Sequence, residues 1–223
     1  GKIETPQFNL RNEVMVRKHV HAAVISELIR MSRQKPEESN LTEEEQEELK
    51  EGYRETFPDY VSSYLFEAGR KYRRSPYSAE RLREIVERYG DRLVSAVREA
   101  FRTHWPEEDQ AVASKEALGR YIEEMPDELQ GVLNRMHERL VWAVSTQRTL
   151  LQKQQEGLLE SSEEALRRRC ERYIKRLRQR NLHNYTLVAL ANEGFLPGYG
   201  LYEQGVRAFA SQRVTGMEGR DDF

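Results

Sequence analysis

Apolar residues recur every three or four positions along residues 127–155, and this pattern constrains the fold more than any other feature. The segment reads DELQGVLNRMHERLVWAVSTQRTLLQKQQ. Its apolar positions are Leu129, Val132, Leu133, Met136, Leu140, Val144 and Leu151. This spacing follows the 3.6-residue turn of an α-helix with one apolar face. The segment therefore predicts a long amphipathic helix, the longest in the chain.

Similar patterns and capping signals predict further helices on both sides of this segment. They cover residues 13–31 after Asn12 as N-cap, the second half of 37–55, 58–72, 78–105, 114–125, 162–180 and 184–192. Thr42 and Glu45 have the spacing of a capping box. Gly90 interrupts an apolar stripe and predicts a bend or a close helix crossing. Pro106 and Pro126 are expected to end the helices before them, and the only candidate strand lies at 206–214.

The composition agrees with a helical protein. Charged residues make up 33% of the chain, whereas Gly and Pro together contribute 20 of 223 residues. This balance favours long amphipathic helices over a turn-rich β fold. We therefore expect an all-α fold, a multi-helix bundle with a short irregular C-terminal segment. Residues 1–183 are expected to form the helical bundle, and residues 184–223 a terminal helix, a Gly/Pro turn and a tail.

Charge is distributed unevenly, although the net charge is only −2. Residues 37–55 contain nine glutamates against Lys50 and Arg54, a local charge of −7. The single cysteine, Cys170, favours a reducing, cytoplasmic compartment, and the lack of an apolar run near 18 residues argues against a membrane partner. The first residue is Gly1 rather than a methionine, so the chain is expected to be part of a longer protein.

Familiar catalytic signatures are missing from the sequence. There is no G-x-x-x-x-G-K-[ST] loop, G-x-G-x-x-G, H-E-x-x-H or G-x-S-x-G motif. His19 and His21 are two positions apart on a predicted helix and so point in different directions, which favours packed or surface roles over metal binding. We therefore predict no catalytic residue, metal ligand or cofactor-binding residue in this chain.

Eight basic residues cluster between residues 167 and 180, with Glu171 as the only acid, for a local charge of +7. They are Arg167, Arg168, Arg169, Arg172, Lys175, Arg176, Arg178 and Arg180. Leu166, Cys170, Tyr173 and Leu177 are spaced to form a narrow apolar seam that docks the helix and leaves the arginines outside. Such a helix can contact a nucleic-acid backbone, with binding that weakens as salt increases. Alternatively, the arginines form a solvated face or pair with the glutamates of 37–55.

The segment LANEGFLPGYG, residues 190–200, contains two predicted turns. Gly194 is placed to adopt a left-handed conformation after a helix, so that Phe195 packs onto Leu190 as in a Schellman cap. Residues 196–199 suit a type II turn, with Pro197 and Gly198 at its centre. These turns would hold Phe195 and Tyr199 rigidly for a partner or a nucleic-acid base.

The same segment, followed by GVRAF with Arg207, resembles a stretch of large superfamily-two DEAD/DEAH-type helicases of bacterial DNA repair and phage defence. This group includes DISARM-type defence helicases. RNEVMVRKHVHA resembles the group's N-P-x-x-x-R-R-H segment at Asn12, Arg17 and His19, but it has Glu13 and Lys18 in place of proline and arginine. Together the two segments cover about 30 residues. The resemblance implies an ATP-dependent parent protein whose motor domains hold ATP and Mg²⁺, with this chain as an accessory helical region.

Three functions are compatible with these observations. The first is a non-catalytic helicase module in which the cluster 167–180, Phe195, Tyr199 and Arg207 contact DNA or RNA, next to motor domains of the same protein. The second is an interaction module that binds a partner subunit through its charged helices. The third, an independent enzyme, is the least favoured because no reactive constellation is visible.

Overall fold

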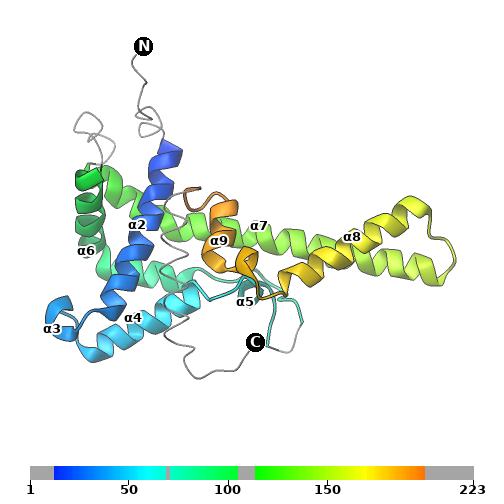
Figure 1. Cartoon of the computed structure of the whole chain (residues 1–223), viewed down its shortest axis with the longest axis horizontal. Helices are drawn as coiled ribbons and strands as arrows, with labels where there is room; N and C mark the ends of the chain where they lie inside the picture. The colour runs from blue at the N-terminus through cyan, green and yellow to red at the C-terminus, as the bar shows by residue number, and fades with distance from the viewer. Residues whose placement is uncertain (1–12, 69–70, 105–113, 199–223) are drawn as a thin grey trace, which may run out of the picture.

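The computed structural model describes residues 13–68, 71–104 and 114–198, and these residues form an all-α fold (Figure 1). In chain order its elements are α2 (Glu13–Arg33), α3 (Pro36–Ser39), α4 (Glu43–Thr56), α5 (Ser62–Leu65), α6 (Glu80–His104), α7 (Lys115–Gln155), α8 (Ser161–Leu177), the 3-10 helix η2 (Leu182–Asn184) and α9 (Thr186–Asn192). The described residues include two isolated β-bridges but no strand. The predicted multi-helix bundle is therefore confirmed. The candidate strand at 206–214 and the predicted caps at Asn12 and Pro106 lie outside the described residues.

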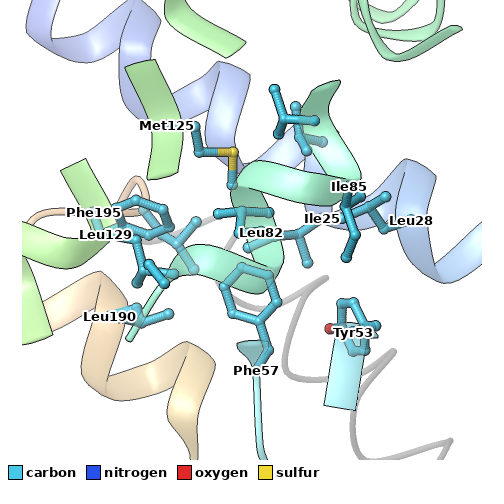
Figure 2. Packing of buried hydrophobic residues seen from close by; sticks show 14 of the residues in the cluster. Ile25, Leu28, Tyr53, Phe57, Leu82, Ile85, Met125, Leu129, Leu190 and Phe195 are labelled. Atoms are coloured by element: carbon cyan, nitrogen blue, oxygen red, sulfur yellow. The ribbon is translucent and has the colours of Figure 1, made fainter. Parts of the chain in front are cut away.

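One hydrophobic core joins helices from both ends of the chain. Figure 2 shows side chains from five helical regions meeting there. They include Ile25 and Leu28 of α2, Tyr53 and Phe57 at the end of α4, Leu82 and Ile85 of α6, Met125 and Leu129 of α7, and Leu190 and Phe195 at α9. Burial of these large apolar side chains provides the main driving force for folding. The C-terminal α9 thus packs into the same core as the N-terminal α2.

Two helices continue through positions at which the sequence predicted a helix end (Pro126) or a bend or close helix crossing (Gly90). α7 continues for 41 residues through Pro126, which is buried. A proline removes one backbone hydrogen bond, but apolar residues on both sides of Pro126, such as Met125 and Leu129, are buried in the same core and hold the helix together. α6 likewise continues through Gly90, and a Cβ atom added there would have no atom within 4 Å. No neighbouring helix therefore crosses closely at Gly90.

Within residues 58–68 and 71–72 the structure has a single helical turn, α5, rather than the longer helix predicted over 58–72. Their backbone groups find partners elsewhere in the fold. The amide of Val61 donates to the carbonyl of Asn184 at 2.9 Å, and the amide of Arg73 donates to the carbonyl of Leu65 at 2.8 Å. The buried hydroxyl of Tyr64 also donates to the carbonyl of Thr56 at 2.6 Å. These longer-range contacts outweigh the local helical spacing.

The predicted caps are confirmed where the structure describes them. Thr42 and Glu45 form the capping box of α4. At the end of α9, Gly194 has a φ of 82°, and the amide of Phe195 donates to the carbonyl of Leu190 at 2.9 Å, as in a Schellman motif. The type II turn prediction is wrong at Gly198, because Gly157 and Gly194 are the only described glycines with positive φ.

Candidate nucleic-acid interface

The second half of α7 and α8 form an antiparallel helical hairpin that projects from the body of the molecule (Figure 1). We call this hairpin the arm and define it as residues 141–177. The connection contains Gly157, whose φ of 75° favours glycine. Lys153 of α7 and Glu163 of α8 join the two helices across this connection, with Nζ and Oε2 2.7 Å apart. The basic cluster predicted from the sequence therefore lies mostly on a protruding element.

An apolar seam docks α8 onto α7, as predicted. Cys170 is buried, and Leu166, Tyr173 and Leu177 are half-buried. Ile174, which the predicted seam did not include, is also half-buried and packs against the main core. The seam orients α8 so that most of its basic side chains face outward.

Three of the eight basic residues pair with glutamates of the same helix. Arg167 lies 2.8 Å from Glu164 and 3.3 Å from Glu171, and Arg168 lies 3.0 Å from Glu164. Hydrogen bonds from Arg167 and, more weakly, from Arg168 lower the pKa of Glu164 to about 2. Lys175 lies 4.0 Å from Glu171. We call Arg167, Arg168 and Lys175 the paired triad.

Two further basic residues contact aromatic rings of the body. The guanidinium carbon of Arg178 lies 4.4 Å from the ring centroid of Phe66, and that of Arg180 lies 5.9 Å from the ring centroid of Tyr60. Cation–π contacts of this kind restrain the arginine side chain. They connect the base of the arm to the segment around α5.

Arg169, Arg172 and Arg176 remain, and we call them the open row. All three are exposed, and none has an ion-pair partner among the described residues. Their spacing of three and four residues places them along one side of α8. The open row therefore presents three positive charges on the surface of the arm that no acidic side chain of the described residues neutralises by an ion pair.

The acidic helix α4 does not neutralise this row. Its glutamates pair instead with α6, because Arg88 lies 3.0 Å from Glu48 and 3.5 Å from Glu45. Among the described residues, no basic side chain of α8 pairs with a glutamate of 37–55. For the basic side chains of α8, the described residues therefore do not show the alternative in which they pair with the glutamates of 37–55.

Of the remaining predicted contact residues, Phe195 is not on the surface. It is only 2% exposed, and its ring stacks on His21 with the ring centroids 4.2 Å apart. The Schellman turn directs it into the core, so it supports the fold and is not available to stack on a base. Tyr199 and Arg207 lie outside the described residues.

A hollow of about 500 Å³ lies between α7 and α8 beside the open row, and we call it the Trp142 hollow. Its lining includes Trp142, Cys170 and Tyr173 together with Arg139, Arg169 and Arg176. Trp142 is 58% exposed. Neither Trp142 nor Arg139 was predicted from the sequence to belong to a site. The available signal was that Trp142 lies two residues after Leu140, which places this aromatic residue off the apolar stripe of its helix.

Comparison with protein-family models, with curated proteins and with solved structures found no match. Within residues 13–68, 71–104 and 114–198, no helix has the length and apolar character needed to cross a membrane. The same residues contain no group of three or more His, Cys, Asp or Glu side chains arranged to hold a metal ion. The site is therefore defined by its own geometry and charge.

Proposed function

We propose that this chain is a non-catalytic helical module that contacts the phosphate backbone of a nucleic acid through the open row. The observation that carries the proposal is the exposure of Arg169, Arg172 and Arg176 without acidic partners among the described residues. Guanidinium groups bind phosphate oxygens with two parallel hydrogen bonds, and each contact releases counterions from the nucleic acid. A row on a projecting arm offers such contacts to an extended strand.

The sequence resemblance supports a place for this module within an ATP-dependent helicase or translocase. In that arrangement the motor domains of the same protein would bind ATP and Mg²⁺, and the arm would hold DNA or RNA close to them. The motor motifs that this assignment requires would lie in the parent protein, beyond the residues of this chain. The flanking gene sequence is therefore its direct test. Finding no helicase motifs upstream would contradict the assignment.

Phosphate contact is tested by two matched triple variants of α8. The first replaces the open row with glutamine (R169Q/R172Q/R176Q), and the second replaces the paired triad (R167Q/R168Q/K175Q). Both remove three positive charges from one helix, so a general charge effect would weaken binding equally. We expect the first variant to lose most of its binding to fluorescent single-stranded DNA, whereas the second retains it.

Fluorescence anisotropy measures the affinity of each protein for single-stranded DNA at several salt concentrations, from low to moderate. Loss of three phosphate contacts is expected to reduce the slope of log affinity against log salt by about 2 for a single strand. Circular dichroism checks that both variants remain helical. Equal binding by the parent and by the open-row variant would contradict the proposed function.

A partner-subunit function is the second candidate, and exposed apolar residues on the arm favour it. Leu158 is 65% exposed and Leu151 is 38% exposed, both near the end of the hairpin. Specific capture of a protein partner, without DNA affinity at low salt, would favour this function over the first. A Leu151→Asp/Leu158→Asp variant that abolishes capture would locate the contact on the arm.

A further inference from the structure

The Trp142 hollow combines an exposed aromatic ring with arginines that form no ion pair within the described part of the chain. Trp142 of α7 is more than half exposed, which is unusual for the largest apolar side chain. Tyr173 and the buried Cys170 of α8 line the same hollow. A flat ring and an apolar floor are suited to a flat, weakly polar group that enters from solvent.

Arginines of the open row lie at this same hollow. Arg169 and Arg176 line it, and neither has an acidic partner among the described residues. Arg139 also lines it but pairs with Glu193. Among the described residues, Glu138 is the only acidic residue in the lining. The hollow therefore places an aromatic surface beside two guanidinium groups that can receive anions.

We propose that the Trp142 hollow binds a base of a single-stranded nucleic acid, stacked on Trp142, while Arg169 and Arg176 contact the phosphates on either side. This inference rests on the proposed function, because it uses the same arginines for backbone contact. It adds a preference for single strands, since the bases of a duplex are already stacked inside the helix. An aromatic platform beside a basic groove is how proteins bind single strands without reading their sequence.

The experiment uses Trp142 as its own reporter. The chain has two tryptophans, so a Trp105→Phe background leaves Trp142 as the only one. This protein is titrated with oligo(dT) and with an abasic oligomer of the same length, which has the same phosphates but no bases. We expect oligo(dT) to quench Trp142 and to bind about fivefold or more tightly than the abasic oligomer.

Substitutions separate stacking from charge. Trp142→Ala is expected to lower the affinity for oligo(dT) to that for the abasic oligomer, and Trp142→Phe to restore part of the difference. The salt dependence should remain in both variants because the arginines are intact. Leu158→Ala removes a comparably exposed apolar side chain at the end of the arm and should leave both affinities unchanged.

The two proposals fail in different ways. If oligo(dT) and the abasic oligomer bind equally, and the R169Q/R172Q/R176Q variant still loses binding, the stacking inference is overturned while backbone contact stands. If neither oligomer binds at low salt, both proposals are overturned. If an apolar peptide quenches Trp142 and oligo(dT) does not, the hollow is a protein-binding site.

Discussion

At the scale of single residues, His21 connects the two ends of the chain. Its Nδ1 lies 2.8 Å from the carbonyl oxygen of Phe195, 174 positions away in the sequence, and its ring stacks on Phe195. Burial lowers its pKa to about 4, although the hydrogen bond to Phe195 opposes this shift. The ring is thus neutral at pH 7, with Nδ1–H donating to the carbonyl group.

Because burial favours the neutral form of His21, we expect the free energy of unfolding to decrease at low pH. The pKa of His21 is about 4 when folded and about 6.5 in an unfolded chain, so the unfolded state binds more protons between these values. The contribution to stability is complete above pH 6.5, falls as the pH drops, and is lost by about pH 4. We expect it to total about 3 kcal/mol. Urea denaturation at pH 7 and at pH 4.5 measures the change.

The control is His21→Asn, which retains a donor near the position of Nδ1 but does not titrate. Its free energy of unfolding should change less between the two pH values than that of the parent protein. Equal losses in both proteins would show that carboxylate groups, rather than His21, account for the acid sensitivity. The sequence left open whether His21 is packed or on the surface, and it could not predict the contact with Phe195, because that contact depends on the complete fold.

At the scale of elements, the sequence predicted most local caps, although not the turn at Gly198, and it did not predict contacts between distant segments. The capping box at Thr42 and the Schellman turn at Gly194 depend on residues within one or two turns, and both were predicted correctly. The helix end at Pro126 and the helix over the described part of 58–72 were predicted incorrectly, because buried contacts with other elements decide their conformation. The positive charge of α8 was predicted from the sequence. The open row could also have been found there, since Arg169, Arg172 and Arg176 have no acidic residue three or four positions away.

Two glycines within these elements are expected to respond oppositely to alanine. Gly90→Ala should raise the free energy of unfolding by about 0.5–1 kcal/mol, because alanine is the better helix former and its methyl group meets no atom. Gly194→Ala should lower it by about 1 kcal/mol or more, because a φ of 82° strains a residue with a side chain. Urea denaturation of the two variants at pH 7 compares them directly. A stable Gly194→Ala protein would mean that the turn can rearrange.

At the scale of the whole molecule, the body and the arm differ in how they are held. The main core includes α7 residues as far as Leu140, with Val144 packed against its edge. Beyond that point α7 packs mainly on α8, and Leu151 and Leu158 are exposed. The arm is therefore stabilised by one helix–helix interface, whereas the body is enclosed from several sides.

This difference should appear in hydrogen exchange. We expect backbone amides in residues 145–165 to exchange faster than those in residues 118–140, although both segments are largely helical, because the arm can open without disrupting the core. Mass spectrometry of peptides from the native protein measures both segments in one experiment. Similar protection in the two segments would indicate that the arm and the body unfold together.

The continuity of α7 has a mechanical consequence. At a rise of 1.5 Å per residue, its 41 residues extend about 60 Å, from the core to the end of the arm. A strand pulling on the open row would act through α8 on the second half of α7, while the first half of α7 is packed against α2 and α6. Pro126 removes one backbone hydrogen bond from α7, but the buried residues around it hold the helix in the core. We therefore expect a force on the arm to rotate α7 as one rigid element relative to the body, and not to bend it at Pro126.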